Sequence, residues 1–363
     1  MTPQDLHSEL NRFDSKLPLE AALTPPSSWY LDARFFALES RTVFHHHWQY
    51  IGLTDQIPNE GDYVTGKFMH QPWVLIRGKD KKVRAFYNVC RHHAACVASG
   101  AGNTRQLTCP YHGWTYELDG TLRKAPKTDG IRDFDPKEYG LVPLQIEELG
   151  RFVFAHFGRP EKSVEESYPG ILARLEEMNS SSLHFVKRVT YLLDCNWKVF
   201  VDNYLDGGYH VSQLHQDLAS ELDLSSYRTE IFDLYSIQSC HSGQRASKRL
   251  QGGALYAWLY PNVMINRYGN MMDVNWVIPR TENTCEVIFD YFFDTVEGES
   301  AKKAIELALK NSDQVQKEDM DISRSVQTGL GSAAYDQGRY SPVFEAPALH
   351  FHHLLKKDYS REI

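Results

Sequence analysis

The sequence predicts an α+β fold, in which an all-β domain precedes an antiparallel sheet that carries helices to one side. Short apolar alternations between turns run from Trp48 to about Phe157, and helical patterns follow them. A β-rich stretch then leads into a long helix near the end of the chain. A length of 363 residues exceeds one ordinary core and suits two domains.

These patterns divide the chain into three segments. Residues 1–44 form an N-terminal arm that we expect to pack on the second domain, residues 45–157 form the all-β domain, and residues 158–363 form the second domain. Within the all-β domain Asp119-Gly120 is a strong hairpin signal, because both residue types tolerate the positive φ angles of a tight turn.

The second domain combines helices with strands. Helical patterns cover residues 164–178, where Pro169 interrupts them early, and residues 196–211. Strand patterns lie within residues 254–293, and a long helix is expected over residues 299–330. This order favours an antiparallel sheet with helices on one side.

Composition narrows the class of protein. Hydrophobic residues make up 42% and charged residues 24%, which excludes disordered, collagenous, coiled-coil and disulfide-rich classes. The formal charge of −8 argues against a nucleic-acid partner, and no apolar stretch approaches the ~20 residues that cross a membrane. The polar first residues, without an apolar stretch, predict no secretory signal. We expect a cytoplasmic protein, or one in an organelle stroma if a transit peptide was removed.

Two loops in the all-β domain each pair a cysteine with a histidine. Cys90 and His92 stand in the first loop, and Cys109 and His112 stand in the second. A structural zinc site also uses two Cys and two His, although zinc fingers usually group like residues together. The alternating order favours a Rieske [2Fe–2S] cluster, in which one iron takes two cysteines and the other takes two histidines.

Other prominent cysteines and histidines are expected to have ordinary roles. His93 is interpreted as a surface or supporting histidine, and Cys96 as a core residue. Residues 45–47 are all histidine, but consecutive residues of a strand point to alternate faces and cannot easily converge on one metal.

A second constellation lies in the second domain, where His210 and His215 follow two aspartates. In a helix Asp202, Asp206 and His210 are i, i+4 neighbours on one stripe, and a carboxylate behind a histidine fixes its tautomer. The five-residue spacing of the histidines requires the helix to loosen or end between them. Two imidazoles need one acid to make the 2-His-1-carboxylate site of non-haem Fe(II) oxygenases. The alternative is two ordinary polar histidines.

The third ligand must come from another segment, and the long helix offers Glu318, Asp319 and Asp321. The apolar stripe of this helix is expected to contain four residues: Val315, Ile322, Val326 and Leu330. Asp319 lies roughly 25° from the centre of that stripe, and the other two acids lie further round. Since a buried carboxylate needs a cation, Asp319 is the expected ligand and Glu318 is the fallback.

With both constellations in this order, nearly the whole chain resembles the α subunit of Rieske non-haem iron oxygenases, most of all the choline monooxygenase branch. The segments that carry the resemblance are PYHGW, GLVPL, WKVFVDNYLDGGYHV, YPNVMINRYG, VQKEDMDISRSVQTGL and GRYSPVFE. The resemblance implies a Rieske domain, a helix-capped catalytic sheet, a [2Fe–2S] cluster and a mononuclear Fe(II). It also implies a homotrimer and a ferredoxin or flavin/iron-sulfur reductase that draws on NAD(P)H.

The resemblance further implies an acid that bridges the cluster histidine of one chain and the iron histidine of its neighbour. That acid normally lies three residues before the first iron histidine, where this chain has Gly207. Asp206 is the first choice for the bridging role and Asp202 is the second.

The resemblance implies a monooxygenase that hydroxylates a small substrate with O2, with a quaternary ammonium such as choline (to betaine aldehyde) as the first candidate. Tyr256, Trp258 and Tyr260 alternate along one predicted strand, and Trp276 lies on another strand of the same sheet. An aromatic box of this kind binds cations through ring faces. The competing interpretation is that these aromatics form sheet core.

Other functions remain as alternatives. The same aromatic residues would suit an aromatic-ring hydroxylase or an N- or O-demethylase of the same family. A Rieske electron carrier without catalysis would not need the second set of ligands. A zinc-stabilised binding module would be colourless, whereas the cluster makes a protein reddish brown.

Overall fold

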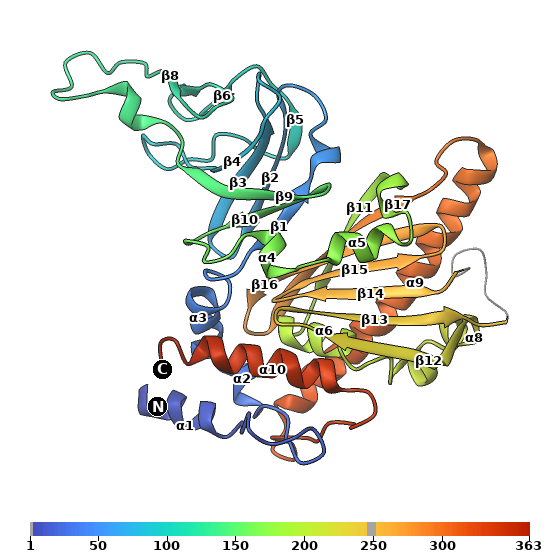
Figure 1. Ribbon diagram of the computed structural model, residues 1–363. Helices are drawn as coiled ribbons and strands as arrows, with labels where there is room; N and C mark the ends of the chain where they lie inside the picture. The colour runs from blue at the N-terminus through green and yellow to red at the C-terminus, as the bar shows by residue number, and fades with distance from the viewer. Residues whose placement is uncertain (1–2, 245–251) are drawn as a thin grey trace. The chain divides into compact units, whose positions relative to one another are not determined.

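The computed structural model describes residues 3–244 and 252–363, and the chain forms two compact units. The smaller unit is Trp48–Glu166, and the larger unit combines Met1–His47 with Ser167–Ile363 (Figure 1). The all-β domain expected over residues 45–157 therefore begins slightly later and ends slightly later in the structure.

The smaller unit is built on a seven-stranded antiparallel sheet and a separate three-stranded sheet. The large sheet runs in the order β1 (Gln49–Leu53), β10 (Phe152–His156), β9 (Pro143–Leu149), β4 (Val83–Tyr87), β3 (Gln71–Arg77), β2 (Asp62–Phe68) and β5 (Ala101–Asn103). The small sheet contains β6 (Leu107–Thr108), β7 (Thr115–Tyr116) and β8 (Leu122–Lys124). Two short 3-10 helices are η1 (Thr54–Gln56) and η2 (Pro136–Tyr139).

The expected hairpin joins β7 to β8. Gly120 has a φ of +87°, and its N–H donates to the carbonyl of Glu117 at 3.0 Å. The turn packs on the core, because a Cβ on Gly120 would lie 2.4 Å from a ring carbon of Phe86. A glycine is needed here both for its backbone conformation and for the space.

The larger unit contains a second seven-stranded antiparallel sheet. Its order is β11 (His184–Leu193), β17 (Thr284–Phe293), β16 (Met271–Thr281), β15 (Val263–Tyr268), β14 (Ala254–Leu259), β13 (Tyr235–Ser242) and β12 (Leu222–Ile231). The central strands are buried along almost their full length, because helices cover the face that would otherwise meet water.

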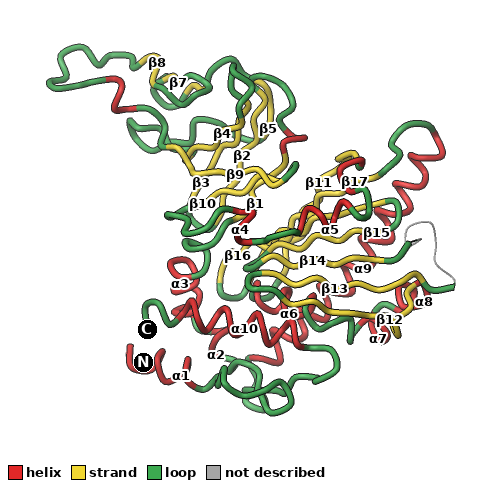
Figure 2. Tube along the Cα trace, in the orientation of Figure 1, coloured by secondary structure: helices red, strands yellow, loops and turns green. Residues whose placement is uncertain are grey.

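The larger unit holds most of the helices of the chain, as the tube drawing shows (Figure 2). They are α1 (Pro3–Asn11), α2 (Ser28–Leu31), α3 (Ala33–Thr42), α5 (Ile171–Glu176), η3 (Ser180–Ser182), α6 (Trp197–Tyr204), α7 (Val211–Leu214), α8 (Gln216–Glu221), α9 (Glu299–Leu330) and α10 (Ala346–Tyr359). Pro169 separates α5 from α4 (Val164–Ser167), as predicted, and α9 has the predicted bounds. Helix α6 packs on β16 and β17, and α9 packs on α6 and β11.

The N-terminal arm is tied into the core of the larger unit by Glu39 of α3, which is fully buried. Its carboxylate accepts hydrogen bonds from Trp197 Nε1 and Tyr359 OH, both at 2.7 Å, and pairs with Lys198 Nζ. A buried ion pair of this kind needs such additional hydrogen bonds to offset its desolvation.

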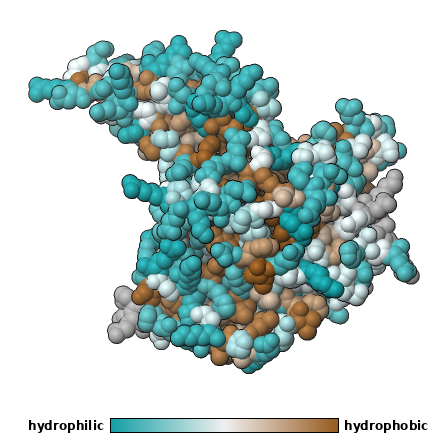
Figure 3. Space-filling view, viewed as in Figure 1, coloured by the Kyte–Doolittle hydropathy of each residue, from teal (hydrophilic) through white to brown (hydrophobic). Residues whose placement is uncertain are grey.

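Hydrophilic residues cover much of the surface that is visible in the space-filling view (Figure 3). In the described part of the chain, each helix is either too short or too polar to cross a membrane.

Candidate metal centre and cluster loops

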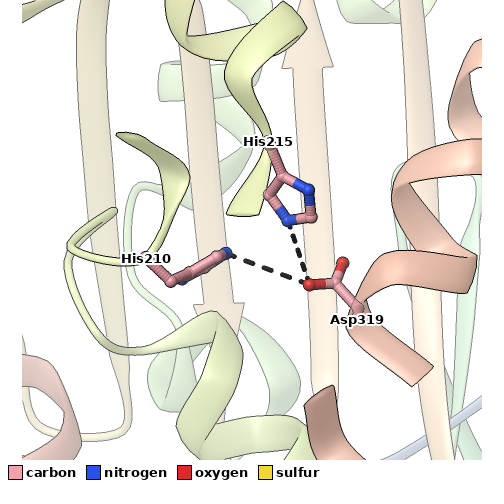
Figure 4. Close-up of side chains that lie close together, drawn as sticks. All are labelled: His210, His215 and Asp319. Atoms are coloured by element: carbon pink, nitrogen blue, oxygen red, sulfur yellow. Dashed lines mark hydrogen bonds and ion pairs between the residues drawn. The ribbon is translucent and has the colours of Figure 1, made fainter. Parts of the chain in front are cut away.

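Three side chains of the larger unit converge: His210, His215 and Asp319 (Figure 4). Asp319 Oδ1 lies 3.0 Å from His215 Nε2 and 3.9 Å from His210 Nε2. One potential ligand atom from each residue lies within 4.8 Å of the other two. Two imidazoles and one carboxylate are the donor set that non-haem Fe(II) takes in oxygenases, so these residues could hold that metal.

The expectation that Asp202, Asp206 and His210 share one helical stripe is wrong, because α6 ends at Tyr204. The glycine pair that follows has φ angles of +70° and +76°, a left-handed conformation that ends helices. Asp206 still reaches His210, since its carboxylate accepts from three successive backbone amides of the turn and lies 2.6 Å from His210 Nδ1. A turn therefore makes the contact that the helix was expected to make.

Besides Asp319, each histidine of the triad has a second carboxylate within hydrogen-bond distance of its Nδ1 atom. Asp206 serves His210, and Glu318 Oε2 lies 2.7 Å from His215 Nδ1. Such a carboxylate fixes the tautomer and leaves Nε2 to face the metal position. Glu318, the fallback ligand, thus orients His215 instead. Burial raises the pKa of Glu318, but hydrogen bonds from Gln314 and His215 outweigh it and hold that pKa below its ordinary value.

Asp319 projects from a face of α9 that is more polar than expected. Ile322 and Val326 were assigned to a buried apolar stripe, but they are 39% and 44% exposed. The residues of α9 that are buried are mostly small or polar: Ala301, Ser312, Gln316, Ser323 and Leu330. Asn203 Nδ2 of α6 donates to Asp319 Oδ1 at 2.8 Å. This face of α9 tolerates polar side chains because it lies against α6 and a cavity.

The triad opens into a cavity of about 120 Å³. At ~10–15 Å³ for each water position, this space suits one small organic molecule. Six aromatic residues contribute to its wall: Phe200, Tyr204, Tyr227, Tyr256, Tyr268 and Phe289. Burial raises the pKa of Tyr204 and that of Tyr227 well above the usual range, so both phenols stay neutral. A positive charge in this space would meet neutral ring faces.

Of the four residues expected in an aromatic box, Tyr256 lines the cavity and three do not. Trp258 and Tyr260 pack on Phe351 of α10, with ring centroids 5.5 and 6.3 Å apart. Trp258 shares a face of β14 with Tyr256, and Tyr260 follows the end of the strand, but α10 covers both residues. Trp276 points to the other face of the sheet, because its neighbour Asn275 lines the cavity and strand residues alternate.

The polar part of the cavity wall was not predicted from the sequence. It includes Asn266 on β15 and Asp273 and Asn275 on β16, all of them buried. The signal that could have identified them is the alternation of an aspartate and an asparagine within the otherwise apolar segment MMDVNWVIP. Polar residues at period two in a buried strand must share one face, and burial requires partners for them.

The two cysteine–histidine loops lie in the smaller unit. Cys90 and Cys109 belong to one buried core cluster, and each is 2% exposed. His92 and His112 are exposed, and their ring centroids lie 4.7 Å apart. Buried thiols with exposed imidazoles fit a cluster whose cysteine-bound iron lies inside and whose histidine-bound iron lies at the surface.

The two loops share one backbone hydrogen-bond pattern. In each, the cysteine N–H donates to the carbonyl five residues on at 2.8 Å, and the amide four residues on donates back at 3.0 Å. That fourth residue is Ala94 in one loop and Gly113 in the other, with φ angles of +61° and +74°. Tyr116, which lies outside the motif, also contacts the first loop. Its hydroxyl accepts a hydrogen bond from Arg91 N at 3.0 Å and lies 3.3 Å from Cys90 Sγ.

The remaining cysteines and histidines lie outside both sites. His93 is exposed, with its ring centroid 4.0 Å from that of His92. Cys96 is exposed, which corrects its assignment to the core, because it lies in the loop after the first turn. Residues 45–47 do not converge: His47 Nε2 pairs with Asp358 Oδ2 of α10 at 2.8 Å.

Asp202, the second choice for a bridging acid, is engaged away from His210. It accepts a hydrogen bond from Tyr30 OH at 2.7 Å and pairs with His352 Nε2 at 2.9 Å. Asp202 and Asp206 both line a second cavity of about 240 Å³ in the same unit. The contacts therefore favour Asp206 as the acid that acts on the first histidine.

Both parts of the chain match known family models. A model described as a Rieske [2Fe–2S] domain matches residues 47–135, and one described as a ring hydroxylating alpha subunit catalytic domain matches residues 180–360. The chloroplastic choline monooxygenase of Arabidopsis thaliana is 44% identical over 97% of this chain and 86% of that protein. The chain belongs to the Rieske oxygenase α subunits. Within them it falls in the choline monooxygenase-like branch.

Two further relatives of this oxygenase α subunit come from the same comparisons. The carnitine monooxygenase oxygenase subunit of Escherichia coli K12 is 32% identical over 94% of this chain and 97% of that protein. A crystal structure of the quaternary ammonium Rieske monooxygenase CntA with L-carnitine matches with a TM-score of 0.84 and 30% identity, over 94% of this chain and 99% of that chain. The expected family, α+β fold, monooxygenase class and cofactors, a Rieske cluster and mononuclear iron, are confirmed.

Proposed function

We propose that this oxygenase inserts one atom of O2 into a quaternary ammonium substrate, with choline (to betaine aldehyde) as the first candidate. The observation that carries the proposal is that the triad opens into a small cavity walled by neutral aromatic rings. Ring faces attract a desolvated quaternary ammonium group, which has no N–H to donate to a hydrogen bond. Relatives named for choline and carnitine support the same substrate class.

The residues that hold the two metal groups form part of the proposal. Cys90, Cys109, His92 and His112 hold the [2Fe–2S] cluster, which supplies electrons one at a time. The iron of the larger unit takes His210, His215 and Asp319. Both assignments fit the donor chemistry, since the thiols are buried and the three catalytic-unit donors converge. When bound, that iron supplies the activation of O2.

The chain's own groups prepare the site. Asp206 and Glu318 hold the imidazole rings of the triad in one tautomer and one orientation. Asn203 fixes Asp319 Oδ1 through its amide. The aromatic rings give the substrate space an apolar lining, which disfavours water beside a bound substrate.

Electrons come from a separate ferredoxin or reductase that uses NAD(P)H, as is typical of the family. We assign the bridging acid to Asp206 and the assembly to a homotrimer, in which the cluster of one chain serves the iron of the next. The contact of Asp206 with His210 supports the first assignment. The chloroplastic names of the plant relatives support a location in an organelle stroma over the cytoplasm.

An aromatic compound is the second candidate substrate, because the rings that line the cavity would also stack on an aromatic ring. The deciding measurement is substrate-dependent O2 uptake by the holoenzyme with a surrogate reductase. Choline, carnitine, glycine betaine and simple aromatic acids are compared. We expect uptake with choline and none with the aromatic acids. Uptake with an aromatic acid alone would move the enzyme to the ring hydroxylases or demethylases.

A further inference from the structure

The wall of the triad cavity contains one buried amide that differs from the others, that of Gln316 on α9. The residue is 2% exposed. Its Nε2 atom has no hydrogen-bond partner among the described residues. Because burial of a donor without a hydrogen bond costs free energy, such a group in a folded protein requires an explanation, and a ligand is one.

The neighbouring polar groups of the wall are engaged within the protein. The other side-chain amides that line the cavity all donate hydrogen bonds: Asn203, Gln238, Asn266 and Asn275. On α9 itself, Ser312 Oγ lies 2.9 Å from Tyr291 OH. Among the described lining amides, Gln316 alone therefore keeps a donor for another molecule.

Gln316 also lies close to the proposed iron ligand. It precedes Asp319 by three residues on α9, and residues at this spacing are neighbours on one face of a helix. The aromatic rings of the wall come from α6 and from strands of the sheet, whereas the lining residues of α9 are Ser312, Val315, Gln316 and Asp319. Ring faces and the donor of Gln316 thus reach the cavity from different elements.

We propose that Gln316 is a substrate-binding residue whose Nε2 atom donates a hydrogen bond to an oxygen of the quaternary ammonium substrate, which is the hydroxyl oxygen in choline. This inference rests on the proposed function. The ring faces attract the ammonium group and Gln316 binds the oxygen, so the substrate is held at two points and in one orientation. Because Gln316 lies one turn from Asp319, the carbon that bears the hydroxyl is held beside the proposed iron ligands.

The test separates the hydroxyl group from charge and shape. Binding of choline and of propyltrimethylammonium, in which a methyl group replaces the hydroxyl, is measured by isothermal titration calorimetry on the holoenzyme and on Gln316→Met. Methionine has nearly the length of glutamine but no N–H. We expect the wild type to favour choline. In Gln316→Met the ratio of the two affinities should shift toward the methyl analogue by about five- to tenfold, the usual net effect of one hydrogen bond.

Asn311→Met is the matched control, because Asn311 also carries a side-chain amide on α9 but is exposed and lies outside the cavity wall. It should leave both affinities unchanged. Denaturant unfolding of both variants adds a second measurement. Since Gln316 Nε2 has no partner among the described residues, its loss should not lower the unfolding midpoint.

Three results would overturn the inference. An unchanged ratio of affinities in Gln316→Met would show that the amide does not contact the hydroxyl. Equal weakening of both ligands would reduce Gln316 to a residue that shapes the cavity, and a lowered unfolding midpoint would show that the fold itself uses the amide. A wild-type holoenzyme that binds neither ligand contradicts the proposed function itself.

Discussion

The two proposed metal sites of this chain are formed in different ways. In the smaller unit, each loop brings a cysteine and a histidine together within a few residues, and two backbone hydrogen bonds set each loop in the same turn. In the larger unit, His215 and Asp319 meet across 104 residues of sequence. The loops proposed to hold the cluster are thus local structures, whereas the proposed iron site exists only when α9 is docked on α6.

This difference shows which parts of a site depend on tertiary structure. A local turn presents its ligands as soon as the turn forms, and core packing then buries the thiols. The iron site instead depends on side chains that orient other side chains, such as Glu318 on His215 and Asn203 on Asp319. Changes in one site should therefore leave the other intact, and changes in supporting residues should matter more at the iron site.

The largest effect is expected from removal of one ligand at either site. His210→Ser should reduce turnover to background while the visible absorption of the cluster is unchanged, because the loops of the smaller unit do not need the iron site. Cys109→Ser should do the reverse and remove the cluster absorption while iron still binds to the triad. Absorption spectra, metal analysis and O2 uptake report on all three properties. Retained turnover in His210→Ser would contradict the ligand assignment.

An intermediate effect is expected from Glu318→Gln. The amide is a weaker partner for His215 Nδ1 than the carboxylate, so iron affinity or turnover should fall by about 10- to 100-fold. Asp321→Asn on the same helix is the control, since the Asp321 side chain is 77% exposed, and it should behave like the wild type. Iron titration of the apo-protein, followed by O2 uptake, measures both variants. Equal results for the two would show that Glu318 does not support the site.

The last comparison concerns fold stability at one glycine in each site. Gly207 and Gly113 both have left-handed backbone conformations, which cost an L-residue roughly 1–2 kcal/mol. A Cβ on Gly113 would meet only Pro126 Cγ at 3.7 Å, whereas a Cβ on Gly207 would lie 2.2 Å from the carbonyl oxygen of Phe344. Gly113→Ala should therefore lose about that amount of stability, and Gly207→Ala should lose roughly 1–3 kcal/mol more.

Denaturant unfolding of the two alanine variants, with Ala94→Gly as a companion, tests this ranking. Ala94 has the same backbone position as Gly113 in the other loop, with a φ of +61°. Relief of strain there should largely offset the extra freedom of glycine in the unfolded chain, so stability should change little. A larger loss for Gly113→Ala than for Gly207→Ala would reverse the comparison.

Local patterns in the sequence were sufficient for much of this molecule. The Asp119-Gly120 hairpin and the bounds of α9 both depend on neighbouring residues, and the structure has them as predicted. The three residues proposed for iron also converge as expected. Asp319 lies with the two histidines although the apolar stripe from which it was predicted is partly wrong, because Ile322 and Val326 are exposed.

The parts that could not be predicted depend on which element covers which surface. Alternation places Tyr256 and Trp258 on one face, but it does not show that α10 covers the second of them. Asp202, Asp206 and His210 were expected on one helix, whereas α6 ends at Tyr204 and a turn with two glycines at positive φ follows it. The role of Glu318 requires the position of His215 Nδ1, which only the folded chain defines.

The close approach of Phe344 to Gly207 has a consequence for how this chain can change over generations. At the position three residues before His210, where the family resemblance implied an acid, a neighbouring carbonyl oxygen fills the space that a side chain would need. An acid could return to that position only if the segment around Phe344 moved first, and the carboxylate of Asp206 already acts on the same histidine. A return of the acid would therefore need a second, earlier substitution that moves the segment around Phe344. We expect descendants of this sequence to keep the glycine.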